Sequence, residues 1–292
     1  MIVEEVRVCP VCGQKEFAHH LTVKDFTTTG EIFNIQRCTQ CKLLVTSPRP
    51  DEKSIGTYYQ SAQYISHTGG NSSLLDKVYR AVRQRTLRSK LQLINQYQQK
   101  LNLLDYGCGT GEFLATCKDA GWSVTGVEPS EEARKNIRKD IPVFDKLQTV
   151  TTPVNAITMW HVLEHVHKLD ETLAKLRSLL TNNGTIFIAV PNPESYDATT
   201  YKEYWAGYDV PRHLWHFNKY NLKELLNKHN LRLKAIEPMR YDAYYVSLLS
   251  EKYKRPDSSS LLRTASALTN GMISNLKAGK ENYSSLIYIA GS

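Results

Sequence analysis

The sequence predicts an α/β fold, in which a mainly parallel sheet carries helices on both faces and follows a small zinc ribbon and a helical linker. From residue 101 onward, short apolar runs alternate with helical patterns, which is typical of parallel strands joined by crossover helices. Two Cys-x-x-Cys pairs come before this part of the chain, and a long helical pattern lies between. We therefore expect three segments: a ribbon in residues 1–50, a helical linker or lid in 51–100, and the sheet domain in 101–292.

The composition is that of a globular chain. Hydrophobic residues make up 41% and charged residues 23% of the 292 residues, which excludes collagen-like, low-complexity and wholly disordered proteins. No apolar run approaches the roughly 20 residues that a membrane-spanning helix needs, and the first residues lack the basic start and apolar stretch of a signal peptide. We therefore expect a cytoplasmic protein without a membrane partner.

Four cysteines organise the first segment. Cys9 and Cys12 form one Cys-x-x-Cys pair, Cys38 and Cys41 form the other, and 25 residues separate the pairs. Two such pairs can supply four thiolates to one tetrahedral zinc ion. Four sulfurs close the coordination sphere, so the predicted zinc is structural and has no open position for a catalytic water. Disulfides or free thiols are the alternative.

A linker and a long basic helix follow the ribbon. Each proline of Pro48-Arg-Pro50 fixes its own φ, which marks a boundary, and three tyrosines follow at positions 58, 59 and 64. Helical spacing of apolar residues predicts a helix from about Leu74 to Tyr97. Seven basic residues and no acidic residue lie in 77–100, which accounts for most of the net charge of +8. We interpret them as a solvated helix face, with anionic substrate or nucleic-acid contact as the alternative.

The sheet domain is predicted from apolar runs bounded by turn signals. The expected elements are strands over Leu101–Tyr106, Val124–Val127, Val154–Met159 and Thr185–Val190, a possible short strand at Val143-Phe144, helices after Gly111 and Ser130, and a helix from about Asp170 to Leu180.

A glycine-rich turn joins the first of these strands to its helix. Gly107, Gly109 and Gly111 follow Asp105 at alternate positions. Glycine permits a tight turn and close approach of a ligand, and the amino end of the next helix offers free N–H groups. Glu128 ends the next strand, where its carboxylate can accept hydrogen bonds from both hydroxyls of a ribose. An ordinary strand-to-helix turn is the alternative.

These motifs resemble those of the class I S-adenosylmethionine-dependent methyltransferases. Asp105-Tyr-Gly-Cys-Gly-Thr-Gly111 is similar to their first motif, Val127-Glu-Pro-Ser130 to their second, and Trp160-His-Val-Leu-Glu-His-Val166 to the segment after their fourth strand. The resemblance implies a Rossmann-like sheet of parallel strands with an antiparallel C-terminal strand, and it implies S-adenosylmethionine as the cofactor. A zinc-binding segment before such a domain also resembles the group that includes sugar C-methyltransferases.

The resemblance implies cofactor-binding roles for eight residues. Asp105 begins the first motif, the three glycines line the methionine moiety, and the glutamate holds the ribose. The two residues after the fourth strand lie beside the cofactor, and a second aspartate matches the adenine-contacting position only weakly. In chain order these residues are Asp105, Gly107, Gly109, Gly111, Glu128, Asp145, Trp160 and His161.

One of these segments also fits the inverted zinc-protease motif H-x-x-E-H, through His161, Glu164 and His165. Such a protease needs both histidines and the glutamate on one helix, whereas His161 directly follows an apolar strand. We interpret the segment as a strand end and loop beside the cofactor, in which Glu164 and His165 help to hold the loop.

The aromatic segment 204–217 supplies candidate substrate groups in a substrate-side cap near 192–285. It follows the last predicted strand, so it should lie over the carboxyl ends of the sheet, where α/β folds bind their ligands. Arg212 can bind an anion, and a neutral His213 or His216 can accept a proton as general base. We favour His213, which adjoins Arg212 and follows a proline-fixed turn, with pocket walls from Trp205, Tyr208 and Trp215. A purely structural cap is the alternative.

The predicted acceptor is a small molecule with a hydroxyl or an acidic carbon, for example a sugar or another biosynthetic intermediate. DNA amino-methylating enzymes of this fold carry Asn or Asp followed by Pro-Pro and an aromatic residue where this chain has Trp160-His161. Cytosine-C5 enzymes need a nucleophilic cysteine that is absent after the fourth and fifth strands. RNA methylation, using the ribbon and the basic helix to contact phosphates, is one alternative. A non-enzymatic interaction module is the other.

Overall fold

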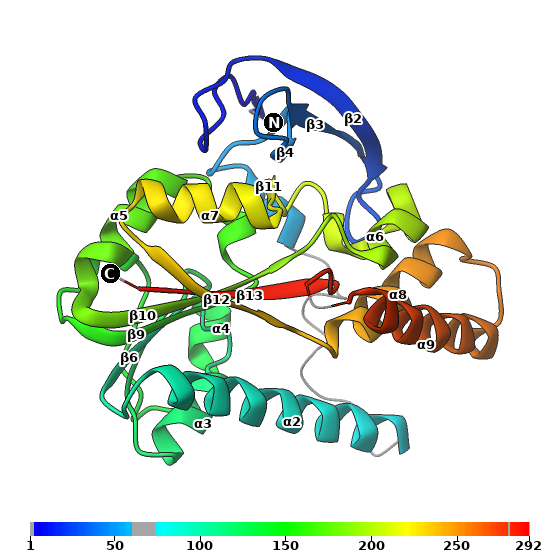
Figure 1. Cartoon of the computed structure of the whole chain (residues 1–292). Coiled ribbons are helices and arrows are strands. Elements are labelled where there is room, and N and C mark those ends of the chain that lie inside the picture. Colours follow the sequence, from blue (N-terminus) through cyan, green and yellow to red (C-terminus); the bar gives the residue numbers. More distant parts are fainter. Residues whose placement is uncertain (1–2, 60–73, 280, 292) are drawn as a thin grey trace.

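The computed structural model describes residues 3–59, 74–279 and 281–291, and only the backbone of 74–81. Tyr64 of the tyrosine cluster lies outside the described residues. A seven-stranded sheet forms the centre of the molecule (Figure 1), in the order β12-β13-β10-β9-β6-β7-β8. Its strands are β6 (Asn102–Tyr106), β7 (Ser123–Val127), β8 (Val143–Phe144), β9 (Val154–Trp160), β10 (Leu180–Pro191), β12 (Arg232–Pro238) and β13 (Ser285–Gly291).

The directions of these strands confirm the predicted fold class. Strands β6 to β10 run parallel to one another, whereas β13 is antiparallel to both β10 and β12. The predicted strand bounds hold within one residue except at β10, which begins at Leu180 instead of Thr185. An irregularity in its pairing with β9 between Leu180 and Thr185 lets the strand continue from the end of the preceding helix.

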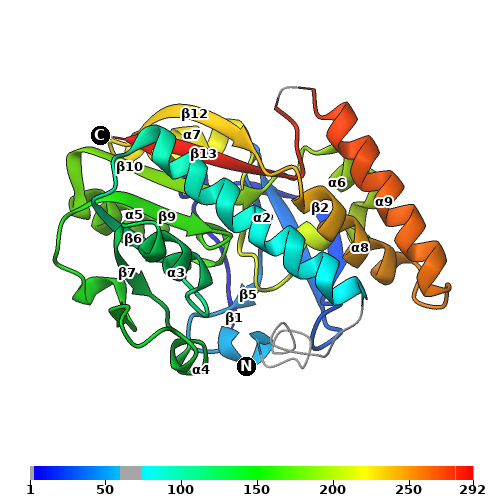
Figure 2. The same ribbon diagram turned by 90° about the horizontal axis from the view of Figure 1, so that it is seen from below.

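Helices cover both faces of the sheet (Figures 1 and 2). One face carries α2 (Leu74–Tyr97), α3 (Glu112–Asp119) and α4 (Glu131–Lys135), and the other carries α5 (Leu169–Leu179) and α7 (Lys219–Lys228). Because consecutive residues of a strand point to opposite faces, Leu103 packs in one buried cluster and Leu104 in the other. Helices α6 (Tyr196–Tyr201), α8 (Asp242–Lys254) and α9 (Ser260–Lys277) lie at one end of the sheet.

The ribbon and the predicted cap share a second sheet. It is antiparallel, in the order β11-β4-β3-β2, and consists of β2 (Phe17–Lys24), β3 (Ile32–Cys38), β4 (Leu44–Thr46) and β11 (Trp215–His216). A further pair joins β1 (Val3–Glu4) to β5 (Arg49–Pro50), in the proline-bounded segment. Since β11 comes from the aromatic segment, the ribbon is built into the wall of the larger domain.

A buried ion cluster fastens these two parts together. Arg212 Nη2 lies 2.9 Å from Asp25 Oδ1 and 2.6 Å from Asp209 Oδ1, and the Arg212 and Asp25 side chains are fully buried. Arg212 also donates to the backbone carbonyl of Tyr58. Its charge is therefore neutralised by the protein itself. Within the described ranges we find no helix whose length and hydropathy would let it span a bilayer.

Candidate functional site

The glycine-rich turn has the backbone that the alternating glycines predict. Gly107, Gly109 and Gly111 have φ values of +74°, +53° and +75°, in the left-handed region that strains other residues. A Cβ on Gly107 would stand 2.5 Å from Val162 Cγ2, so this position must remain glycine for the turn to pack. A Cβ on Gly109 would meet no atom within 4 Å. The turn is thus closely packed at Gly107 and open at Gly109, where a ligand can approach the backbone.

Glu128 lies directly beside this turn. Its Oε2 accepts a hydrogen bond from the Gly109 N–H at 2.9 Å, and its Oε1 accepts one from the Ser130 N–H at 2.9 Å. A carboxylate has about four lone-pair sites, so each oxygen keeps capacity for another donor. Glu128 is half-buried, and the arrangement fits a carboxylate that receives two ribose hydroxyls.

Asp105 and Asp145 occupy different surroundings. Asp105 is buried under the turn, where it accepts a hydrogen bond from Thr158 Oγ1 at 2.6 Å and so links β6 to β9. Burial raises the pKa of Asp105 to about 7, against the opposing effects of Thr158 and Lys90. Asp145 is exposed and follows β8, whose Phe144 carbonyl accepts a hydrogen bond from the Glu128 N–H. Asp145 therefore lies at the same edge of the sheet as Glu128.

Trp160 ends β9 and faces the first turn of α3. Its ring packs edge-on against Phe113, with 5.4 Å between centroids, and Lys90 Nζ lies 4.4 Å from its centroid. The Trp160 Nε1 atom is buried and has no hydrogen-bond partner among the described residues. A buried donor without a partner fits a bound group that offers an acceptor atom.

His161 is held as a cation between two carboxylates. Its Nε2 lies 2.9 Å from Asp242 Oδ2, and its Nδ1 lies 3.4 Å from Glu164 Oε1. Burial by itself disfavours the charged ring, but the hydrogen bond to Asp242 and the nearby Glu164 raise the pKa of His161 to about 10. The ring is therefore protonated at neutral pH and cannot act as a base there. The segment ends in one 3-10 turn, η3 (Leu163–His165), which confirms the strand-end interpretation.

Sequence reasoning missed two of these groups. Lys90 was counted only as one of seven basic residues, although it stands three positions after Leu87 and four before Ile94, both buried in the helix α2 face. That helical spacing was a signal that Lys90 points inward. Asp242 begins α8, about 80 residues after His161, and no local pattern connects the two.

Some basic side chains of helix α2 contact other residues of the protein. Arg83 Nε pairs with Glu112 Oε2 at 2.7 Å, and Arg85 Nε donates to the Tyr241 hydroxyl at 2.7 Å. The side chains of Lys77 and Arg80 lie outside the described part of the chain. Several cations of this helix thus hold it against α3 and the cap.

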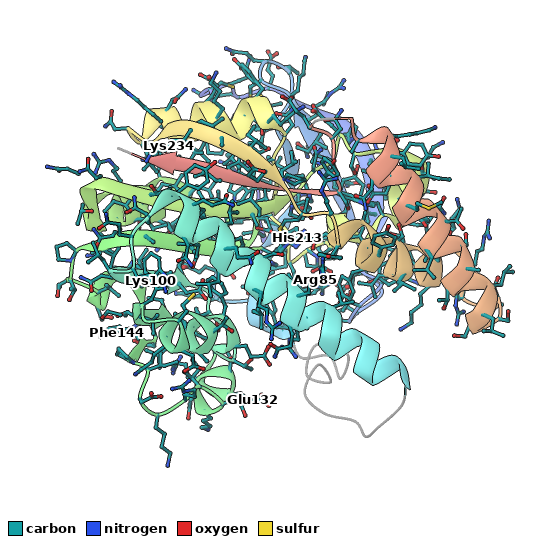
Figure 3. The ribbon with its side chains drawn as sticks, turned by 60° about the horizontal axis from the view of Figure 1, so that its bottom comes forward. Arg85, Lys100, Glu132, Phe144, His213 and Lys234 are labelled. Carbon is teal, nitrogen blue, oxygen red and sulfur yellow. The ribbon has the colours of Figure 1, made fainter. Side chains whose placement is uncertain are left out.

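The two candidate base residues differ in what their rings contact. His213 Nδ1 lies 2.8 Å from the Gly207 carbonyl. A carbonyl only accepts, so Nδ1 carries the proton and the neutral ring keeps a lone pair on Nε2. His216 Nε2 instead lies 3.1 Å from Thr46 Oγ1 inside the second sheet, and burial lowers the pKa of His216 well below its usual range. His213 is therefore the better placed proton acceptor, deep inside the molecule (Figure 3).

The aromatic residues expected to wall a pocket are packed into the core. Trp205, Tyr208 and Trp215 are each at most 4% exposed. Trp205 Nε1 donates to Asp197 Oδ2, and Trp215 Nε1 donates to the Val166 carbonyl. These rings are therefore part of the packed interior and do not form an open pocket wall.

The four ribbon cysteines come together as predicted. Cys9 Sγ lies 3.5 Å from Cys41 Sγ, Cys12 Sγ lies 3.5 Å from Cys38 Sγ, and all four sulfurs lie within 4.8 Å of one another. Sulfurs bound tetrahedrally to zinc at about 2.3 Å stand about 3.8 Å apart, whereas a disulfide would bring two of them to about 2.0 Å. The hydrogen bond with Cys41 lowers the pKa of Cys9 to about 5. The donor set and its spacing fit a zinc ion.

Comparison with known proteins gives a family match over the central part of the chain. A family model described as a methyltransferase domain matches residues 79–236, more than half of the chain. An uncharacterized methyltransferase of Bacillus cytotoxicus is 30% identical over 112 residues, which are 34% of this chain and 52% of that protein. The match thus spans about half the length of this curated relative.

Solved structures share the fold at low sequence identity. A SAM-dependent methyltransferase from Archaeoglobus fulgidus aligns with a TM-score of 0.51 and 22% identity, over 75% of this chain and 98% of that one. Magnesium protoporphyrin IX methyltransferase from Synechocystis, solved with bound SAH, aligns with a TM-score of 0.54 and 15% identity, over 83% of this chain and 100% of that one. At these identities the likeness concerns the fold.

Proposed function

Because the chain belongs to the methyltransferase domain family, we propose that it transfers the methyl group of S-adenosylmethionine to a hydroxyl or an acidic carbon of a small molecule. One observation carries this proposal: the segment after β9 touches both halves of the site. Val162 packs on Gly107 of the glycine-rich turn, and Glu164 and His165 lie beside His213. These contacts support a cofactor at the turn and a base in the cap at the same edge of the sheet.

We propose the following division of roles for the cofactor. Gly107, Gly109 and Gly111 receive the methionine moiety, and Glu128 receives the ribose hydroxyls. Asp105 supports the turn from below. Trp160 and His161 lie beside the cofactor, and Asp145 lies toward the adenine. The cofactor supplies an electrophilic methyl group, and the protein supplies position and the removal of a proton.

His213 is the proposed general base. A methyl group leaving a sulfonium needs a nucleophile in line with it, and a hydroxyl or acidic C–H must lose a proton as it reacts. The Nε2 atom of His213, which lies 4.0 Å from Asp209 Oδ2, can take that proton, while the Nδ1–H bond to Gly207 fixes the ring. His216 is the second candidate and is held inside the sheet by Thr46.

A cofactor-binding experiment tests the function first. Calorimetry should show binding of S-adenosylhomocysteine and none of NAD. Glu128→Ala should weaken S-adenosylhomocysteine by about 1–3 kcal/mol, or about 5- to 150-fold in Kd, because two ribose hydroxyls lose their acceptor. Glu128→Gln keeps one acceptor oxygen and should have a smaller effect.

The matched control is Glu132→Gln, on the exposed first turn of α4, which Figure 3 shows at the periphery. It should bind like the unchanged protein. Normal binding by Glu128→Ala would show that the ribose assignment is wrong, and binding of NAD alone would show that the cofactor is wrong.

For the ribbon we propose a structural zinc ion bound by Cys9, Cys12, Cys38 and Cys41, in a reduced, cytoplasmic chain. The purified protein should keep one zinc per chain through dialysis, and Cys38→Ser should lose it and unfold at a lower temperature, because a structural zinc contributes to folding. Cys117→Ala, which removes a buried thiol on α3 outside the cluster, should keep its zinc. Metal analysis and thermal melting measure both. A zinc-free chain of normal stability would contradict the proposal.

We also propose the boundaries of the three segments and the class of the methyl acceptor. We retain a ribbon in 1–50, a linker or lid in 51–100 and a cofactor-binding domain in 101–292, whose cap near 192–285 faces the acceptor. The internal contacts of Arg83 and Arg85 leave less free charge for phosphates than the sequence suggested, which favours a small acceptor over RNA. Screening sugars and other hydroxylated metabolites for methyl transfer would identify it.

A further inference from the structure

A second cluster of metal-ligating side chains lies next to the proposed active site. Glu164 and His165 come from η3, and His213 comes from the cap, 48 positions further along the chain. One ligand atom from each of the three residues lies within 4.8 Å of the other two. The His165 and His213 rings stand 4.6 Å apart between centroids and nearly perpendicular, at 79°. Three donors from two segments therefore converge on one point.

Both histidines are oriented as metal ligands are. His165 Nδ1 lies 3.0 Å from the Arg212 carbonyl and 3.0 Å from the Tyr59 hydroxyl, which then also accepts, and His213 Nδ1 lies 2.8 Å from the Gly207 carbonyl. Carbonyls accept only, so each Nδ1 carries its proton and each Nε2 keeps its lone pair. A ligating histidine almost always donates its other N–H in this way, to a carbonyl or a carboxylate, which fixes both tautomer and ring.

Glu164 has one charged contact, with His161, but no hydrogen bond within the described part of the chain. Its side chain is fully buried, and neither carboxylate oxygen has a hydrogen bond to any described residue. Oε1 lies 3.4 Å from His161 Nδ1, an ion contact that His161 shares with Asp242. Buried charges are normally paired and hydrogen-bonded or coordinate a metal, because an unpaired one is costly. A cation at the cluster would satisfy the oxygens, with His161 holding the carboxylate in place.

We propose that Glu164, His165 and His213 bind one divalent first-row transition-metal ion through a carboxylate oxygen and two imidazole nitrogens. This donor set suits Mn²⁺, Fe²⁺, Co²⁺ or Zn²⁺ and differs from the four-sulfur ribbon, which selects zinc. Three protein ligands leave coordination positions open to a small molecule, as in catalytic sites and unlike the closed ribbon.

The consequence for catalysis rests on the proposed methyl transfer. An ion at this position supplies Lewis acidity to an acceptor hydroxyl and lowers its pKa. The O–H bond breaks, the proton passes to solvent, the oxygen bonds to the methyl carbon, and the methyl–sulfur bond breaks to leave S-adenosylhomocysteine. His213 Nε2 then acts as a ligand, and it acts as the base only in the metal-free enzyme.

Cobalt titration of the full chain that holds one zinc ion, bound by the four ribbon cysteines, tests the site without cofactor or acceptor. Co²⁺ bound to nitrogen and oxygen gives weak visible bands, without the sulfur-to-metal charge-transfer band that ribbon thiolates would produce. We expect one such Co²⁺ per chain. His165→Ala and Glu164→Gln should each weaken its binding by more than about 100-fold, since even outer-shell changes cost 10- to 100-fold. His229→Ala, which removes a histidine that directly follows helix α7 and pairs with Asp170 of α5, should bind Co²⁺ normally.

Thermal melting and S-adenosylhomocysteine calorimetry separate the possible failures. Variants that melt normally and bind S-adenosylhomocysteine but not Co²⁺ support the metal site. An unchanged Co²⁺ affinity in both variants, or the absence of a sulfur-free Co²⁺ spectrum in the unchanged protein, would overturn it. Failure of the unchanged protein to bind S-adenosylhomocysteine would instead overturn the proposed function and leave the cobalt result standing.

Discussion

His213→Ala is expected to bind S-adenosylmethionine normally and to lose turnover by about 10²–10⁴-fold. The cofactor is proposed to be held by the glycine-rich turn and Glu128, neither of which contacts His213 directly in the hydrogen bonds of the described residues. Removal of the ring takes away the Nε2 lone pair, whether it serves as base or as metal ligand. Single-turnover methylation of an identified acceptor, measured per folded molecule, checks the loss.

Two further measurements distinguish a packing role of His213 from a chemical role, and a base from a metal ligand. If His213 only packs the cap, the variant should melt at a lower temperature while turnover per folded molecule stays largely intact. His165→Ala distinguishes the two chemical roles: a metal role predicts a loss similar to that of His213→Ala and dependence on added metal, whereas a direct base predicts that His165→Ala keeps most turnover. Full activity of His213→Ala would contradict both roles.

Arg212→Met is expected to destabilise the chain by about 3–5 kcal/mol, the usual cost of breaking a buried ion pair. The substitution keeps an apolar stem but leaves the buried Asp25 carboxylate without its guanidinium partner, and Asp209 loses the same partner. Because Asp25 belongs to the ribbon segment and Asp209 to the cap, the connection between the two parts should weaken. Denaturant unfolding measures the change.

The matched control is Arg138→Met. Arg138 also contacts two aspartates, at 2.6 Å from Asp119 and 2.9 Å from Asp140, but on the exposed surface. Exposed ion pairs contribute little because water and salt screen them. Its unfolding curve should therefore stay close to that of the unchanged protein. Similar curves for the two arginine variants would show that the Arg212 cluster does not join ribbon and cap.

The sequence by itself determined the long helix, the strands and helices of 101–190 and the local turn chemistry. The two Cys-x-x-Cys pairs, the alternating glycines and the position of Glu128 at a strand end each depend on residues close together in the chain. Periodicity of apolar residues predicted helix α2 and the parallel strands, since burial on one or both faces leaves a repeating pattern. The positive φ values at Gly107, Gly109 and Gly111 agree with what those local signals require.

Only the tertiary structure decided which distant side chains meet. Arg212, which we expected to be available for an anionic substrate, instead pairs with Asp25, 187 positions earlier in the chain. His213 meets Glu164 and His165 because the cap returns over the end of β9, and His161 becomes a cation because α8 brings Asp242 to it. The sequence around a charged residue or a histidine contains no pattern that identifies the residue it contacts in the fold. The chemistry of such a residue is set by burial and by neighbours within a few ångströms, which the chain acquires only on folding.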